Sequence, residues 1–171
     1  GGLKGFIRLA AVIPMLLPTI TYGFAIIYSF GKQGLLTRLL GRQLFDIYGF
    51  WGLLLGYVIY TLPVSFLLIF NSMGFIDKKF MIVSRVMGDN GFSTFMMTIV
   101  RPLLGTLAAS FIQAFFLCFT DFGIPASVGG GYEVIATLLY NQMLGGIPDF
   151  NRGAVIAMIM LIPSIGSICI L

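Results

Sequence analysis

The sequence has no histidine, only six acidic residues and only two cysteines among its 171 residues. No charged residue falls at the centre of a long apolar run, so a relay of protons across a membrane is not expected. A membrane enzyme needs a cluster of nucleophile, acid, base or metal ligands, and six scattered acids do not supply one. We therefore expect no catalytic residue, no cofactor and no metal site.

Two further absences narrow the function. The GxxxxGK[ST] phosphate-binding loop is missing, so we expect any ATP hydrolysis to occur on a separate subunit. The ten basic residues are scattered among connecting segments and form no dense patch, which argues against a nucleic-acid partner. Cys118 and Cys169 fall inside apolar runs, where we expect them to pack as small residues and not to form a disulfide.

Apolar residues dominate what remains: 58% of the chain is hydrophobic, and the mean hydropathy is +1.03. Crossing about 30 Å of hydrocarbon takes about 20 apolar residues in a helix. Four runs approach that length, at residues 6–30, 48–70, 103–120 and 154–171. The sequence thus predicts an all-α integral membrane protein in which the lipid bilayer is a partner. A start at Gly1-Gly2 without Met suggests a fragment of a longer protein.

The positions of Lys and Arg predict the orientation. The N-terminal flank and the connection at residues 71–101 would share one side of the membrane and carry six basic residues, against four on the other side. The first side is therefore predicted to be cytoplasmic, and the segment 121–152 is predicted to be periplasmic. Within that segment, residues 133–144 favour a short helix on the surface.

Prolines and polar residues inside the runs bear on a transport path. Pro14, Pro18, Pro63 and Pro163 each remove a backbone hydrogen bond, whose carbonyl partner must be satisfied by neighbouring groups. These prolines fit either a moving pathway or static packing. Spacings of four, three and seven place one set of polar side chains on a single stripe, which either holds helices together or contacts a solute. The stripe consists of Thr106, Ser110, Gln113 and Thr120.

A polar interruption lies between the second and third runs, at residues 71–101. Ile76, Phe80, Val83 and Met87 recur at helical spacing, and Asp77 and Gly88 are placed to begin and end that short helix. A second short helix is predicted over residues 92–97 after the turn at residues 88–91. Pro102 is then expected at the start of the third spanning helix.

This interruption resembles the EAA loop of binding-protein-dependent ABC transporter permeases of the MetI-like family. The family pattern is Glu-Ala-Ala, three residues, Gly, nine residues, Ile, one residue, Leu-Pro. Gly88 and Pro102 correspond to the family's Gly and Pro, with one residue more between them than in the pattern, whereas residues 82–84 replace Glu-Ala-Ala and Arg101 replaces Leu. The similarity extends to residues 17–19, 62–66 and 120–137, the last being similar to the iron(III), polyamine, thiamine and phosphonate subfamily. Within it, 2-aminoethylphosphonate-type permeases are favoured.

The resemblance implies a single permease domain over residues 1–171, incomplete and containing core helices three to six of a helical bundle. It implies an inner-membrane importer of a small polar solute, with an ATP-binding cassette subunit, a periplasmic substrate-binding protein and a second permease half as partners. It places the ATPase contact in the interruption, with Phe92 and Phe95 as apolar plugs and Asp89 and Asn90 at the rim. The implied coupling residues are Ser84, Arg85, Gly88, Asp89, Asn90, Gly91, Phe92, Phe95 and Pro102, and the path residues are Thr106, Ser110 and Gln113.

Two alternatives stay open at this point. The chain could be part of a channel or of a secondary transporter that is not driven by ATP, in which the interruption is only a connector. The aromatic residues of the interruption could also anchor it at the membrane interface without touching any ATPase.

Overall fold

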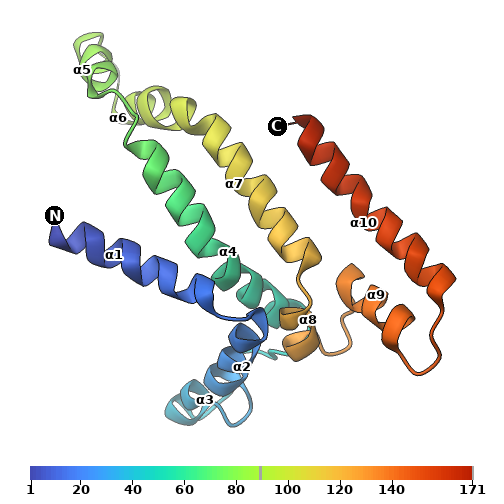
Figure 1. Ribbon diagram of the computed structural model, residues 1–171. Coiled ribbons are helices and arrows are strands. Elements are labelled where there is room, and N and C mark those ends of the chain that lie inside the picture. Colours follow the sequence, from blue (N-terminus) through green and yellow to red (C-terminus); the bar gives the residue numbers. More distant parts are fainter. Residues whose placement is uncertain (89, 171) are drawn as a thin grey trace.

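The computed structural model describes residues 1–88 and 90–170, and within them helices are the regular elements (Figure 1). The expected all-α architecture is thereby confirmed. In chain order the elements are α1 (Gly2–Val12), the 3-10 turn η1 (Ile13–Leu16), α2 (Thr19–Phe30), α3 (Leu35–Leu40), α4 (Phe50–Met73), α5 (Lys78–Val86), α6 (Gly91–Phe95), the π-helical turn η2 (Met96–Val100), α7 (Arg101–Thr120), α8 (Gly123–Val128), α9 (Ile135–Leu144) and α10 (Phe150–Ile170).

Within the described part of the chain, three helical stretches are long and apolar enough to cross a membrane: Phe50–Met73, Gly91–Thr120 and Phe150–Cys169. They correspond to the second, third and fourth predicted runs, although the fourth helix begins at Phe150 and Leu171 lies outside the described residues. A fourth crossing exists only if the pair Gly2–Leu16 and Thr19–Leu40, bent by 102° at its break, counts as one. α4 and α7 run antiparallel and side by side (Figure 1).

The prediction of one helix over residues 6–30 is wrong, because the chain breaks between Leu16 and Thr19. Pro18 has no amide hydrogen to donate to the carbonyl of Pro14, four residues earlier. That carbonyl instead accepts hydrogen bonds from the Leu17 amide, at 3.1 Å, and from the Tyr22 hydroxyl of α2. The expectation that a neighbouring group satisfies such a carbonyl is confirmed here, whereas Pro63 and Pro163 lie inside unbroken helices.

Pro102 lies in the first turn of α7, as predicted. The third spanning stretch nevertheless begins earlier in the chain than predicted. α6, η2 and α7 form one helix, Gly91–Thr120, so the second short helix expected at residues 92–97 is its first part. Within η2 the Arg101 amide bonds to the Met96 carbonyl, five residues back. A proline ring clashes with the carbonyl four residues earlier in a regular α-helix, and the wider π-helical turn lies where that clash would fall.

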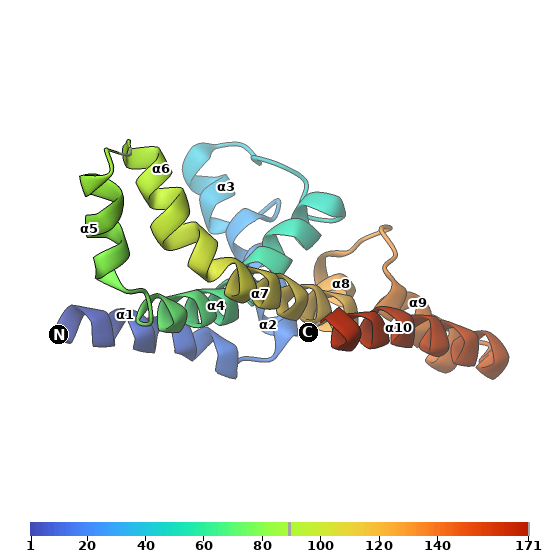
Figure 2. The same cartoon turned by 90° about the horizontal axis from the view of Figure 1, so that it is seen from above.

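The predicted grouping of the N-terminal flank with residues 71–101 is matched by the structure. The Arg8 guanidinium donates to the side-chain oxygen of Asn71 at 3.4 Å and lies 5.7 Å from the centre of the Phe70 ring. Both partners belong to the end of α4 that leads toward α5. Figure 2 shows α9 and α10 on the opposite side of the molecule from α5 and α6.

The buried core is small and lies where α8 packs against α2 and α4. Its most buried members are Tyr22, Ile26, Ile47, Leu53, Ile124 and Val128. Glycines permit this packing: a Cβ on Gly56 would lie 2.6 Å from the Ile124 side chain, and one on Gly52 would lie 1.6 Å from the Ile47 carbonyl oxygen. Such separations are far below van der Waals contact.

Most of the molecular surface stays outside this core. The chain exposes 11642 Å², compared with about 8,300 Å² for a compact soluble protein of its mass. The buried share of the apolar part is 17% in Phe50–Met73, 11% in Gly91–Thr120 and 6% in Phe150–Cys169. The spanning helices therefore depend on lipid or other polypeptides to cover their apolar sides.

Replacing Gly52 by Ala should destabilise the fold by about 1–3 kcal/mol, because the new methyl group meets a fixed backbone oxygen. Gly105→Ala in α7 is the matched control, since nothing lies within 4 Å of its Cβ position. It should leave stability unchanged or raise it by about 0.5–1 kcal/mol. Thermal unfolding in detergent, followed by size-exclusion chromatography, measures both, and equal melting curves would contradict the packing described.

Candidate functional site

The polar interruption forms a helical projection at one end of the α4–α7 pair (Figure 1). We call this feature the knob and define it as α5 through η2. The Asp77 carboxylate accepts the Lys79 amide at 2.9 Å and so caps the start of α5. Gly88 has a φ of 82°, the left-handed conformation that glycine adopts without steric cost. Both predicted helix signals are thereby confirmed.

The second arm of the knob begins with its own cap. The Asn90 side-chain oxygen accepts the Ser93 amide at 2.7 Å, so this residue, predicted as a rim contact, fixes the start of α6. Asp89, predicted for the same rim, lies outside the described residues.

Buried hydroxyl groups join the two arms. Ser84 of α5 and Thr94 of α6 lie 3.1 Å apart, hydroxyl to hydroxyl, and the Thr98 hydroxyl donates to the Thr94 carbonyl. These three residues are 7%, 9% and 2% exposed. Thr94 and Thr98 were not among the predicted site residues, although their spacing of four places them on one helical face.

The apolar residues of the knob point outward. Of the predicted stripe, Phe80, Val83 and Met87 are exposed, whereas Ile76, just before α5, is half-buried. Phe92 and Phe95, the expected plugs, are 74% and 48% exposed. Exposed apolar side chains on a polar segment suit contact with another protein or with a membrane surface.

A hollow of about 320 Å³ separates the arms and gathers part of the predicted set. Arg85 of α5 faces it together with Gly91 and Phe95 of α6, and Thr94 and Thr98 form part of its wall. Phe92 stands outside this hollow, and Pro102 lies beyond the π-helical turn in α7. The predicted coupling residues are therefore not all together. Arg85, Gly91 and Phe95 line the hollow, Gly88 and Asn90 shape the turn, Ser84 joins the arms, Phe92 is exposed outside the hollow, and Pro102 lies at the start of α7.

The predicted path residues do not share one environment. The Thr106 hydroxyl donates to the Ser72 hydroxyl of α4 at 2.9 Å, and Ser110 is buried. Gln113 is exposed on α7, and the Thr120 hydroxyl bonds to the carbonyl of Phe116 in its own helix. Thr106 thus fits the interpretation as an interhelical hydrogen bond, whereas Gln113 faces away from the packed helix pair.

The segment 121–152, at the other end of α7, contains α8 and α9. The Asp121 carboxylate is largely buried and accepts the Ile124 amide at 3.0 Å, which caps α8. Gly130 adopts a φ of 56°, so the glycine run does use a conformation that other residues avoid. The expected short surface helix is α9. Among the residues described, no three His, Cys, Asp or Glu side chains come together as metal ligands.

Comparisons with known proteins find related transport proteins. No protein-family model matches the chain. The ferric transport system permease protein FbpB of Actinobacillus pleuropneumoniae is 26% identical over 163 residues, 92% of this chain and 24% of that protein. The thiamine transport system permease protein ThiP of Salmonella typhimurium is 30% identical over 166 residues, 94% of this chain and 31% of that protein. The spermidine/putrescine transport system permease protein PotC of Escherichia coli is 25% identical over 160 residues, 92% of this chain and 56% of that protein.

The chain thus spans about a quarter of the length of the ferric permeases it matches and about half that of the polyamine permease. The interpretation that the chain resembles 2-aminoethylphosphonate-type permeases in particular stays a prediction. The apolar helices and these similarities together confirm the expected multi-pass location in the bacterial inner membrane. Along nearly its whole length this chain is related to permease proteins of ferric, thiamine and spermidine/putrescine transport systems, as the resemblance in its sequence predicted.

Proposed function

We propose that the chain is part of the permease of an ATP-driven, binding-protein-dependent importer for a small polar solute. The single observation that carries this proposal is the knob, a polar helical projection with outward apolar side chains at one end of the α4–α7 pair. The solute class, iron(III), polyamine, phosphonate or similar, is proposed from the relatives' names and the sequence resemblance.

In this proposal the knob docks on a separate ATP-binding subunit. Phe92 and Phe95 insert as apolar plugs, and Arg85 offers a charge at the hollow between the arms. Gly88 and the Asn90 cap hold the turn that presents them. Because α6 continues through η2 into α7, a push on the plugs reaches a spanning helix without crossing a flexible loop.

Other partners are proposed from the surface that the chain leaves open. A second permease half would cover spanning helices of which at most 17% is buried here. A substrate-binding protein would meet the segment 121–152, which lies away from the knob. Thr106, Ser110 and Gln113 are proposed for the path, with exposed Gln113 the member best placed to meet a solute. The domain assignment, one permease domain over residues 1–171, is part of the same proposal.

Replacing both Phe92 and Phe95 by Ala should reduce recovery of the cognate ATP-binding subunit at least tenfold, since two exposed apolar anchors are lost. Co-purification from membranes measures this. Phe150→Ala is the matched control, because Phe150 is 66% exposed but lies at the start of α10, away from the knob. Undiminished ATPase recovery with the double variant would remove the docking role.

The Ser84–Thr94 contact should stiffen the knob. Ser84→Ala and Thr94→Val should each raise the rate of tryptic cleavage at Arg85 several-fold, because a buried hydroxyl contact worth about 1 kcal/mol is lost. The two effects should be less than additive when combined, since they remove one interaction. Fully additive cleavage rates would show that the hydroxyls act separately.

The proposed orientation predicts the side from which each end is accessible. In a background with Cys118 and Cys169 replaced by Ala, Tyr132→Cys should react with a membrane-impermeant maleimide on spheroplasts, and Lys78→Cys should not. Both positions are exposed in the chain, so a difference in labelling reports the membrane and not local burial. Inverted vesicles should reverse the pattern, and labelling of Lys78→Cys from outside would refute a cytoplasmic knob.

A further inference from the structure

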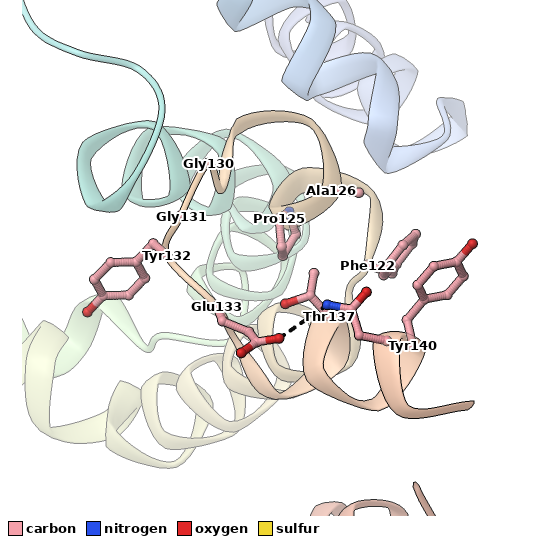
Figure 3. A pocket seen from close by; sticks show the side chains of 10 residues that line it. Phe122, Pro125, Ala126, Gly130, Gly131, Tyr132, Glu133, Thr137 and Tyr140 are labelled. Carbon is pink, nitrogen blue, oxygen red and sulfur yellow. Dashed lines mark hydrogen bonds between the residues drawn. The ribbon is translucent and has the colours of Figure 1, made fainter. Parts of the chain in front are cut away.

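A hollow of about 350 Å³ opens between α8, the glycine run and α9 (Figure 3). Figure 1 shows α8 and α9 away from the knob. Phe122, Tyr132, Glu133, Tyr140 and Asn141 are among its lining residues. Its volume lies at the small end of the range for ligand pockets. The contact proposed for the segment 121–152 as a whole gives this hollow no ligand of its own.

The hollow carries a single negative charge. Of the residues that line it, Glu133 alone is charged. Its carboxylate accepts the Asn141 side-chain amide of α9 at 3.2 Å, the contact drawn in Figure 3. That bond orients the carboxylate and leaves it capacity to accept more hydrogen bonds. The nearest basic residue along the chain, Arg152, is paired with Asp149 at 3.6 Å and does not line the hollow.

Aromatic rings form another wall of the hollow. The rings of Phe122 and Tyr140 lie 4.6 Å apart, centre to centre, and both residues are partly open to solvent. Figure 3 shows this pair on the far side of Glu133 from the ring of Tyr132, which packs against Phe50 at 6.2 Å. Aromatic faces attract cations, and a carboxylate nearby adds charge and hydrogen bonding.

This combination selects among ligand classes. An anion would meet the Glu133 carboxylate, and a purely apolar group would leave that carboxylate unused. A hard metal ion needs several oxygen ligands, and no group of three acidic, His or Cys side chains occurs in the described part of the chain. An organic cation uses both the carboxylate and the rings.

We propose that this hollow binds an alkylammonium or guanidinium group, held by Glu133 and by the Phe122–Tyr140 ring pair. The proposal does not depend on ATPase docking, because none of the residues that line the hollow belongs to the knob. The cation could come from a free solute or from a Lys or Arg side chain of another polypeptide, and the experiment separates these sources.

The test uses the protein in lipid nanodiscs with 3-fluorotyrosine at its seven tyrosines, and Tyr140→Phe assigns the Tyr140 fluorine signal. Titration with n-butylammonium should shift that signal saturably. n-Butanol, neutral and of similar size, should not. Glu133→Gln should weaken the apparent affinity at least tenfold while keeping an oxygen that accepts from Asn141.

Asp149→Asn is the matched control, because Asp149 belongs to the same segment but does not line the hollow. Its side-chain oxygen accepts the Arg152 amide at 3.1 Å, a bond that Asn can also accept. This variant should bind n-butylammonium as the parent does. Unchanged signals of the remaining tyrosines in Glu133→Gln show that the variant is folded.

Competition by a tetralysine peptide would identify a polypeptide side chain as an admissible source, whereas exclusion of the peptide would restrict the site to free solutes. Equal shifts with n-butanol, or unchanged affinity in Glu133→Gln, would overturn the proposal. Because the readout is binding to the permease chain alone, its failure would leave the ATPase-docking proposal untouched, and failure of docking would leave this site standing.

Discussion

Hydrocarbon offers no hydrogen-bond partner to a backbone group, and this constraint decides where the chain can leave regular helix. At the first break, Pro18 cannot donate to the carbonyl of Pro14, and the Tyr22 hydroxyl and the Leu17 amide take its place. Ahead of Pro102 the helix widens to a π turn and stays hydrogen-bonded, with the Arg101 amide on the Met96 carbonyl. At the first site the helix breaks and a side chain of the next helix supplies a donor, whereas at the second the helix stays continuous and the backbone itself supplies it.

The same shortage of internal partners explains how little of the chain is buried. Its core forms only where glycines let α8 approach α2 and α4, as at Gly56 against Ile124. α10 packs mainly on α9, and 6% of its spanning stretch is buried. Helices in a membrane need no self-contained core, since lipid covers apolar faces as well as protein does. The helices therefore pack loosely on one another and leave large apolar surfaces free for contact with other molecules.

Local signals were readable from the sequence, and contacts across turns were not. Asp77 marks the start of α5 and Gly88 lies just past its end, as predicted. Both signals could be read from the sequence because a cap and a left-handed glycine act within a few residues. α8 was missed, since six residues containing Gly and Pro carry no clear period. The Ser84–Thr94 contact depends on how the turn at Gly88 folds one arm onto the other, which periodicity within either arm does not specify. The continuity of α6 with α7 was missed for a related reason: the proline was weighed without the π turn that accommodates it.

That continuity changes how the proposed importer would transmit motion. A separate coupling helix on a loose tether would lose much of any displacement in its linker. Here α6 continues without a break into the spanning helix α7 as the first part of Gly91–Thr120, and the Ser84–Thr94 pair ties α5 to α6. Next to the knob, the Thr106 hydroxyl of α7 donates to the Ser72 hydroxyl of α4, so these two helices are also joined at the ends that lie near the knob. A displacement applied at the knob would therefore move α4 and α7 together. The π-helical turn η2 is the point at which the helix Gly91–Thr120 can bend.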